Sequence, residues 1–254
     1  MPSPEQTTTR SPTIVIPARL ASERFPKKVL ADETGRPLVQ HVVDRVADLG
    51  RVVVAADDEA VVEALEPFGT TVLLTSPACR TGTERVAEAA EKLDLPDDVV
   101  VINVQGDEPE IDPDVVARLA SRMAGDDEPV MGTVVVSFPP DADPANPALV
   151  KVVVGQGDVG CLWFSRSPIP FARFATPAYR LHVGVYAYRV GFLRQIAATP
   201  PTPAELSESL EQLRALETGH RIVGVEAAGH AGGIDTPEQY AAFVKKFRAS
   251  TASC

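Results

Sequence analysis

The chain has 254 residues, of which 44% are hydrophobic and 23% are charged, a balance typical of a globular protein with a sizeable core. The formal net charge of −11 argues against a general binder of nucleic acid or anionic membranes, because such proteins need broad basic surfaces. No apolar run approaches the roughly 18 residues that span a bilayer, so we expect no membrane insertion. Any anionic substrate would have to be met by a local cluster of Arg and Lys.

Three cysteines, Cys79, Cys161 and Cys254, show no CxxC spacing and no His-rich partner segment. They are typical of reduced thiols in a cytoplasmic protein and not of a disulfide frame or a zinc site. Residues 1–12 are rich in Pro, Ser and Thr and lack the apolar stretch of a signal peptide. We therefore expect a cytoplasmic protein whose first 12 residues form a disordered leader.

After this segment, short apolar runs alternate with segments of helical periodicity. From Leu38 to Leu49, for example, apolar residues recur three or four positions apart, which describes one face of a helix. Successive strand–helix–strand units favour a parallel sheet with right-handed crossovers and helices on both faces. The predicted strands are 13–17, 51–56, 71–74 and 98–104, and the predicted helices are 38–49, 58–65 and 83–93.

After about residue 130 the pattern changes to short β-type runs joined by Pro- and Gly-rich turns. Because no helical segment separates most of these runs, antiparallel pairing is favoured there. A single helix is predicted over 205–217, with Gly219 as its cap, and it is followed by a strand over 221–226 and a helix over 237–247. The β-type runs are 131–138, 150–154, 160–164 and 182–188.

A basic segment follows the first predicted strand, at the strand end where open α/β sheets usually bind ligands. Four positive charges fall within ten positions of an otherwise acidic chain: Arg19, Arg24, Lys27 and Lys28. Guanidinium and ammonium groups so placed suit the phosphates of a nucleoside triphosphate. The same residues also suit an ordinary exposed loop. Neither a GxGxxG turn nor a P-loop motif is present, so neither of these phosphate-binding motifs accounts for the basic segment.

Two further segments each place a carboxylate near the end of a predicted strand or the start of a helix. Asp107, in Gln105-Gly106-Asp107, has the oxygen ligands that Mg²⁺ prefers, although Gly and Asp are also common in simple turns. Asp235, just before the last predicted helix, is a second candidate ligand, although Asp in that position often caps a helix. Neither segment by itself shows whether its Asp binds a metal ion or only stabilises a turn or the start of a helix.

Taken together and in order, these segments resemble the 3-deoxy-manno-octulosonate (KDO) cytidylyltransferase family, also called CMP-KDO synthetases. The resemblance covers residues 13 to 245, and the ordered set of motifs is far more specific than any one of them. The motifs are Ala18-Arg19-x-x-Ser22-x-Arg24-x-Pro26-x-Lys28, Gly82-Thr83-Glu84-Arg85, and the segments 103–109, 150–153, 164–170, 182–186, 210–214 and 234–237.

The resemblance implies a doubly wound, largely parallel α/β sheet of the Rossmann-like, nucleotide-diphospho-sugar transferase type, with a β-rich insertion. Residues 13–130 and 220–248 would form the nucleotide-binding core of a single domain (13–248), and residues 131–219 a lobe for sugar binding and dimerisation. The implied activity is transfer of CMP from CTP to KDO, which activates KDO for lipopolysaccharide-type glycans. Mg²⁺ would be the cofactor and a homodimer the assembled form.

The resemblance also implies a role for particular residues, several of which have structural alternatives. Arg166 could instead pair with an acid, His182 could be a satisfied half-buried histidine, and Tyr186 could fill a core. Glu211 could form a helical pair with Arg214. The expected catalytic residues are Arg19, Arg24, Lys28, Asp107 and Asp235, with Asp107 and Asp235 as metal ligands; the expected nucleotide-binding residues are Arg19, Ser22, Lys28, Thr81, Gly82, Thr83 and Gln105; and the expected sugar-binding residues are Arg166, His182, Tyr186, Glu211 and Gln212.

Three other functions remain open at this level. The acceptor could be another acidic sugar, such as sialic acid or 8-amino-KDO, because one sequence does not reveal sugar stereochemistry. A uridylyl- or molybdopterin-type nucleotidyltransferase would share a basic first loop, but in a Gly-rich form, and this loop has no glycine. A nucleotide-binding module without catalysis would have no need of both carboxylates.

Overall fold

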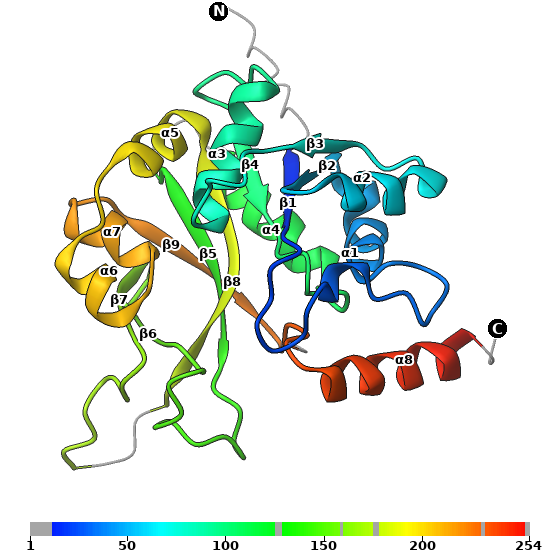
Figure 1. Ribbon diagram of the computed structural model, residues 1–254. Helices are drawn as coiled ribbons and strands as arrows, with labels where there is room; N and C mark the ends of the chain where they lie inside the picture. The colour runs from blue at the N-terminus through cyan, green and yellow to red at the C-terminus, as the bar shows by residue number, and fades with distance from the viewer. Residues whose placement is uncertain (1–11, 125–128, 158–159, 175–177, 230–231, 252–254) are drawn as a thin grey trace, which may run out of the picture.

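The computed structural model describes residues 12–124, 129–157, 160–174, 178–229 and 232–251. Cys254 and all but the last residue of the predicted leader lie outside these ranges, so the disordered leader stays a prediction. Within the described ranges the strands form one nine-stranded sheet (Figure 1). They are β1 (Thr13–Ala18), β2 (Arg51–Ala56), β3 (Val72–Leu74), β4 (Val100–Asn103), β5 (Met131–Ser137), β6 (Lys151–Val154), β7 (Cys161–Ser165), β8 (Arg180–Arg189) and β9 (Ile222–Ala227).

The strand order is β3-β2-β1-β4-β8-β5-β9-β7-β6. The first four strands of the chain pair in parallel, with β1 between β2 and β4, as the alternation of strands and helices predicts. Beyond β4 the sheet is mixed, since β8 runs antiparallel to both β4 and β5 while β9 runs parallel to β5. The prediction of a largely parallel sheet therefore holds for β1 to β4 and for the β5–β9 pair, whereas β8 and the β6–β7 hairpin are antiparallel to their neighbours.

Helices cover both faces of the sheet, as a doubly wound fold requires. They are α1 (Leu38–Val46), α2 (Glu59–Leu65), α3 (Gly82–Lys92), α4 (Pro113–Met123), α5 (Val190–Ala198), α6 (Pro203–Glu208), α7 (Gln212–Glu217) and α8 (Pro237–Thr251), with short 3-10 helices η1 (Lys28–Leu30), η2 (Ala47–Leu49) and η3 (Glu66–Phe68). Alternate residues of each strand point to opposite faces. Ile14 and Ile16 pack with α1, α2 and α4 in one core, whereas Val15 packs with α3, α5 and α7 in the other.

The β-rich region continues this sheet and shares its two cores. Val134 and Val183 belong to the core that contains Ile14, and Phe164 belongs to the core that contains Val15. The predicted insertion is thus built into the same sheet as β1 to β4. Its separate role in sugar binding and dimerisation stays a prediction.

Two helices, α4 and α5, have no counterpart among the predicted elements. The start of α4 has clear local signals, because Asp112 accepts a hydrogen bond from the backbone N–H of Asp114 (3.0 Å) and Pro113 occupies the first turn. Its buried residues recur at helical spacing from Val115 to Met123. A turn after β4 and a helix returning to the sheet could therefore have been predicted there.

The single helix predicted over 205–217 is wrong, because the structure has α6 and α7 with a break between them. Ser209 follows α6 in the left-handed region (φ 50°), which no continuing helix adopts. The guanidinium group of Arg166 binds the carbonyl oxygens of Glu208 and Ser209 and so stabilises the end of α6. Gly219 follows α7 with φ 83°, as expected for its cap.

Helix α8 lies to one side of the sheet, next to α1 and the loop after β1 (Figure 1). Its Tyr240, Phe243 and Val244 pack on Leu38 of α1 in a small core of their own. This packing fixes the segment that precedes α8, which contains Asp235. Within the described ranges, no helix has both the length and the apolar character needed to cross a bilayer.

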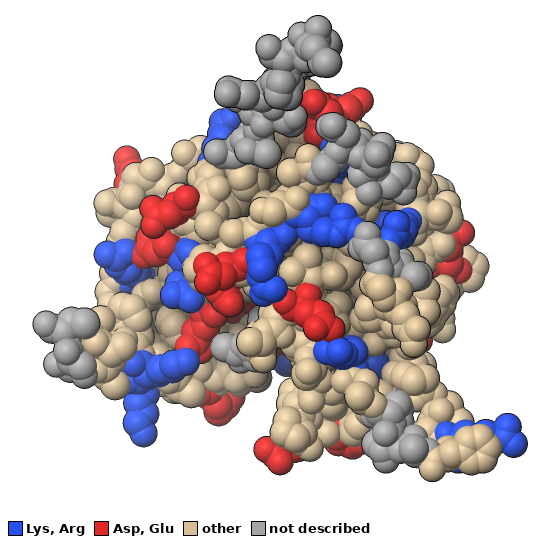
Figure 2. Space-filling model, turned by 180° about the vertical axis from the view of Figure 1, so that it is seen from behind, with Lys and Arg blue, Asp and Glu red and all other residues tan. Residues whose placement is uncertain are grey.

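Charged side chains of both signs are interspersed on the face opposite the view of Figure 1. Figure 2 shows patches of Lys and Arg separated by patches of Asp and Glu, without a uniformly basic field on this face. Together with the net charge of −11, this arrangement agrees with the expectation that an anionic substrate is met by a local basic cluster.

Candidate active site

The basic segment after β1 lies against the segment after β4, and a glycine makes this possible. A Cβ atom at Gly106 would lie 2.8 Å from the carbonyl oxygen of Pro17 and 3.6 Å from the side chain of Ile16. Only glycine therefore allows the two strand ends to approach so closely. As a result, Asp107 faces the loop that carries Arg19, Arg24 and Lys28.

The two candidate carboxylates, far apart in the sequence, meet at this edge of the sheet. The backbone N–H of Ile234 donates to the carbonyl oxygen of Asp107 (2.8 Å), which holds the segment before α8 beside the segment after β4. Nζ of Lys28 is 2.5 Å from Oδ2 of Asp107 and 2.8 Å from Oδ1 of Asp235. Arg24 forms a second ion pair with Asp235 (2.7 Å). Four of the five expected catalytic residues thus form one cluster.

These ion pairs determine which charges the cluster carries. Burial lowers the pKa of Lys28, but the charge of Asp107 and hydrogen bonds to both carboxylates outweigh it and leave the pKa raised. Burial likewise raises the pKa of Asp235, but Lys28 and Arg24 outweigh it and leave the pKa lowered. Both groups are therefore ionised at neutral pH, as a site for metal and phosphate requires.

A pocket of about 280 Å³ opens beside this cluster. Five of the seven residues expected to bind the nucleotide line it, and the other two, Thr81 and Thr83, flank one of these five, Gly82, which is the first residue of α3. The pocket is lined by Pro17, Arg19, Ala21, Ser22, Lys28, Val29, Gly82, Gln105, Gly106 and Asp107.

Arg19, the fifth expected catalytic residue, has an unused donor at this pocket. Its Nη1 donates to the carbonyl oxygen of Arg80 (2.8 Å), whereas Nη2 is buried and has no partner within the described part of the chain. Burial and the neighbouring charge of Arg85 lower the pKa of Arg19. A buried donor without an acceptor is costly, and an anionic oxygen in the pocket would relieve that cost.

The N-terminal end of α3 forms another wall of the site. Thr81 caps the helix by accepting a hydrogen bond from the backbone N–H of Glu84 (3.2 Å). The free backbone N–H groups of the first turn favour a negatively charged or carbonyl-bearing ligand there. Thr83, in the same turn, hydrogen-bonds to Tyr188 of β8 and so connects the nucleotide side to the β-rich region.

Most of the expected sugar-binding residues gather on β8 and α7, next to the pocket. The hydroxyl of Tyr186 donates to Oε1 of Gln212 (3.2 Å), and the rings of His182 and Tyr186 lie 5.3 Å apart. Nε2 of Gln105 donates to the carbonyl oxygen of Gly184 (3.2 Å), which joins this group to the nucleotide side. Burial raises the pKa of Tyr186 well above its usual value, so its hydroxyl remains a neutral donor.

Glu211 and Arg166 differ in their relation to this group. Glu211 lines a small cavity with Thr83 and Gln212, and its negative charge reaches Arg19. The guanidinium group of Arg166 instead holds three carbonyl oxygens, those of Pro147 (2.8 Å), Glu208 (2.6 Å) and Ser209 (3.2 Å). The structure therefore gives Arg166 a structural role, and its role as a sugar ligand stays a prediction.

Two residues that support the basic loop were not singled out from the sequence. Oδ1 of Asp57 accepts the backbone N–H of Leu20 (3.2 Å), and Asp57 lies 3.5 Å from Arg85, which is 1% exposed. Nη1 of Arg85 also donates to Thr75 (2.5 Å). Arg85 occupies the buried side of α3, and a charged residue within such an apolar helical face is a signal that could have been recognised.

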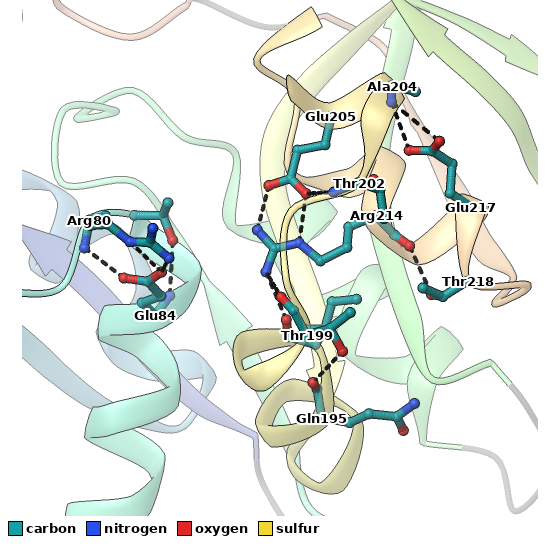
Figure 3. A network of polar contacts seen from close by, with 12 residues as sticks. Arg80, Glu84, Gln195, Thr199, Thr202, Ala204, Glu205, Arg214, Glu217 and Thr218 are labelled. Carbon is teal, nitrogen blue, oxygen red and sulfur yellow. Dashed lines mark hydrogen bonds and ion pairs between the residues drawn. The ribbon is translucent and has the colours of Figure 1, made fainter. Parts of the chain in front are cut away.

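A buried ion pair between Arg214 and Glu205 holds α7 in position (Figure 3). Nε of Arg214 donates to Oε2 of Glu205 (2.7 Å), and its Nη1 donates to the carbonyl oxygens of Ile196 and Thr199. Both charged side chains are less than one-tenth exposed. Arg214 therefore connects α5, α6 and the helix whose first residue is Gln212.

Comparison with known proteins decides the family. The sequence pattern of the cytidylyltransferases matches residues 13–222. The chain belongs to the cytidylyltransferase family. Within this family it is 44% identical to the 3-deoxy-manno-octulosonate cytidylyltransferase of Idiomarina loihiensis over 239 residues, 89% of this chain and 94% of the relative. It is 46% identical to the protein of the same name from an Anaeromyxobacter species, over 90% of this chain and 93% of the relative.

Solved structures agree with this assignment. A CMP:2-keto-3-deoxy-manno-octonic acid synthetase complexed with CTP is 40% identical to this cytidylyltransferase, with a TM-score of 0.84 over 96% of this chain and 99% of that chain. A glucose-1-phosphate thymidylyltransferase from Bacillus anthracis is only 15% identical but has a TM-score of 0.64 over 92% of this chain and 94% of that chain, which shows a shared fold. The fold is therefore that of a mixed α/β nucleotidyltransferase.

The carboxylate pair of this cytidylyltransferase has the donor set that Mg²⁺ prefers. Oxygens of Asp107 and Asp235 already converge on one cationic group, the ammonium of Lys28. Across the described ranges, no cluster of three or more His, Cys, Asp or Glu side chains is placed to hold a metal ion. Mg²⁺ usually takes one or two carboxylates and completes its coordination with water and substrate phosphates, so a pair next to a phosphate pocket fits it.

Proposed function

We propose that this cytidylyltransferase transfers CMP from CTP to KDO and releases pyrophosphate. The observation that carries the proposal is the meeting of Asp107 and Asp235 opposite the basic loop, beside a pocket with an unsatisfied arginine donor. The names of its relatives supply the substrates, and a solved relative at 40% identity is complexed with CTP.

The nucleotide would lie with its phosphates along the loop after β1. Arg19 and Lys28 bind phosphate oxygens, and Arg24 adds positive charge where pyrophosphate leaves. Thr81, Gly82 and Thr83 at the start of α3 present hydroxyl and N–H groups to the cytosine base, and Ser22 and Gln105 complete the pocket. No side-chain nucleophile is needed, because phosphoryl chemistry of this kind depends on positioning and charge.

The sugar would bind between β8 and α7, with its hydroxyl group directed at the α-phosphorus of CTP. The amide N–H of Gln212, which has no partner within the described residues, and the hydroxyl oxygen of Tyr186 are available to sugar hydroxyls, with His182 and Glu211 beside them. Asp107 and Asp235 would hold Mg²⁺, which would supply positive charge to lower the pKa of the attacking hydroxyl and to screen the two anionic substrates.

A pyrophosphate-release screen tests this proposal. The four ribonucleoside triphosphates are paired with KDO, 8-amino-KDO and sialic acid, each with and without Mg²⁺. We expect release only with CTP, KDO and Mg²⁺ together. Release with sialic acid in place of KDO would change the acceptor, and the absence of release with every pair would contradict a catalytic function.

The β-rich region also offers a surface for a second copy of the chain, and we propose a homodimer. Among the described residues, most of the exposed large apolar side chains lie on β7, on the β7–β8 connection and on α6, with Leu74 on β3 as the exception. The exposed apolar residues of this surface are Leu162, Trp163, Phe171, Phe174 and Leu206.

We also place the enzyme in the cytoplasm. Free Cys79 and Cys161 fit the reducing conditions there.

A further inference from the structure

The ammonium group of Lys28 lies between the two carboxylates that the proposed function assigns to Mg²⁺. Its Nζ is 2.5 Å from Oδ2 of Asp107 and 2.8 Å from Oδ1 of Asp235, and the side chain is 12% exposed. A magnesium ion bound to one oxygen of each carboxylate, at about 2.0–2.1 Å, would have to occupy the same space. The ammonium group and the metal ion therefore exclude each other.

The charges of the cluster reinforce this exclusion. Lys28 and Arg24 neutralise both carboxylates in the arrangement described here. A divalent cation that approaches this arrangement meets a balanced cluster with a fixed positive charge at its centre, and the repulsion is strong because Lys28 is largely shielded from water. A free metal ion thus has little to gain from the site as long as Lys28 stays in place.

We propose that Lys28 acts as a placeholder, which occupies the metal site in the nucleotide-free enzyme and leaves it when CTP arrives. The inference rests on the proposed function, because it takes Asp107 and Asp235 as the metal ligands. Lys28 also lines the phosphate pocket, so a triphosphate offers its ammonium group new partners within reach of a side-chain rotation. The metal then enters with the nucleotide and not before it.

Binding of Mn²⁺ to the nucleotide-free protein tests the placeholder directly. Free Mn²⁺ is followed by electron paramagnetic resonance for the wild type, Lys28→Met and Lys27→Met. The two variants each remove one positive charge from the same loop, but Lys27 is exposed and lies outside the carboxylate pair. We expect Lys28→Met to bind Mn²⁺ roughly tenfold more tightly than the wild type, because its site has lost a repelling charge, and Lys27→Met to bind like the wild type.

A further substitution tests whether the additional Mn²⁺ affinity of Lys28→Met comes from the expected carboxylates. Adding Asp235→Asn to Lys28→Met should remove the gain in Mn²⁺ affinity. Equal or weaker Mn²⁺ binding by Lys28→Met than by the wild type would overturn the placeholder role, as would a gain that survives Asp235→Asn. Neither experiment contains CTP or sugar, so a failure here is distinct from the absence of pyrophosphate release with KDO, which would contradict the proposed function.

Thermal unfolding supplies a second measurement and a check on folding. Without Lys28 the two carboxylates repel each other, so Lys28→Met should unfold at a lower temperature in the absence of metal. Mn²⁺ should then raise its Tm by more than it raises that of the wild type, because only a ligand of the folded state stabilises it. An equal rise in both proteins would contradict the proposal. Lys28→Gln, which keeps a hydrogen-bond donor without the charge, serves in the same comparison if Lys28→Met does not fold.

Discussion

At the scale of single residues, the site depends on charges that neutralise one another until substrate arrives. Asp107 and Asp235 face Lys28 and Arg24, and Arg19 faces a pocket with a donor to spare. Each of these groups has a better partner in a bound triphosphate or a metal ion than in its neighbour. Loss of any one should therefore affect catalysis more than folding.

The carboxylates give the most direct prediction. Asp107→Asn and Asp235→Asn each keep the side-chain shape but remove one metal-binding charge, and we expect turnover to fall by roughly 10²–10³. Pyrophosphate release at saturating CTP, KDO and Mg²⁺ measures this. Asp112→Asn is the matched control, because Asn caps α4 as well as Asp does and the residue is exposed. Wild-type turnover of Asp107→Asn would exclude its role as a metal ligand.

Arg19 gives a prediction about substrate preference. Arg19→Lys keeps the positive charge but loses the forked donors, one of which is buried without a partner. We expect KM for CTP to rise by about tenfold, the equivalent of one charged hydrogen bond, with little change in KM for KDO. Steady-state kinetics in which each substrate is varied in turn gives the KM for CTP and the KM for KDO separately. Arg51→Lys, at an exposed residue, is the control. A rise confined to KDO would place Arg19 on the sugar side.

The residues of the site differ in how well sequence alone predicts them. Arg19, Lys28 and Asp107 follow strand ends, where topology brings them together, so their positions could be predicted. The role of Arg166 could not, because the three carbonyl oxygens that it holds come from loops whose paths depend on tertiary packing. Burial of Arg85, by contrast, has a signal in the sequence, because this charged residue lies within the apolar face of α3.

At the scale of elements, the docking of α7 depends on the buried pair of Arg214 and Glu205. Arg214→Met leaves Glu205 buried without its partner, so we expect a loss of about 3–5 kcal/mol in the free energy of unfolding, measured by urea titration. Replacing both residues, with Arg214→Met and Glu205→Leu, should cost much less than the sum of the two single changes. Additive losses would show that the two charges do not interact.

The same pair should influence the sugar more than the nucleotide. Arg214 lies on α7, two positions after Gln212, which accepts the hydroxyl of Tyr186. In the double variant, which restores stability, we expect KM for KDO to stay raised while KM for CTP stays close to wild type. Equal changes in both constants would indicate a general loss of structure instead.

Helix α8 packs on α1 through His41, which gives a pH dependence. Burial lowers the pKa of His41, whose ring contacts Phe243 and Phe247. Because the unfolded chain takes up this proton near pH 6.5 and the folded chain does not, the free energy of unfolding should fall as the pH drops below about 6.5. We expect the urea midpoint of the wild type to fall further between pH 7.5 and 5.5 than that of His41→Gln.

The comparison with His41→Gln is needed because another buried group has the opposite effect. Burial and the charge of Asp107 raise the pKa of Glu108 to about 8, so the folded protein keeps up to that pH a proton that the unfolded chain releases at lower pH. Glu108 therefore favours the folded state at lower pH. Glu108 is present in both the wild type and His41→Gln, so the difference between their urea midpoints as a function of pH reports His41 alone. Parallel pH dependence in the two proteins would show that the fold does not keep His41 neutral.

Elements with one-sided periodicity were predictable, and those decided by tertiary contacts were not. The helices over α1 and α3 follow from their apolar spacing and caps. The break between α6 and α7 was missed because leucines continue at helical spacing through 206–216, whereas Ser209 turns left-handed only where Arg166 binds the chain. Local pattern and tertiary contact disagree there, and the contact determines the structure.

At the scale of the whole molecule, the exposed apolar residues predict an assembly. Phe171 and Phe174 are 85% and 92% exposed. We expect the wild type to be a dimer by light scattering after size exclusion, and Phe171→Ser with Phe174→Ser to shift it toward the monomer. Leu74→Ser, on an exposed apolar residue at the other edge of the sheet, is the control and should leave the dimer intact. A monomeric wild type would contradict the proposed homodimer.

The architecture as a whole was predictable in its first half and less so in its second. Parallel pairing follows from alternating strands and helices, because a crossover helix leaves few other arrangements. The position of β8 between β4 and β5 did not follow, because antiparallel strands of similar composition offer several partners. Family resemblance supplied what periodicity could not, above all the expectation that Asp107 and Asp235 meet.

That meeting has a consequence for the role of α8. One carboxylate of the proposed metal site follows β4, whereas the segment that carries the other is held by packing of helix α8 on α1. Without the docking of α8, the segment that contains Asp235 would lose the packing that holds it opposite the basic loop. We therefore expect the proposed activity to depend on this helix, although none of the residues expected at the site lies on it.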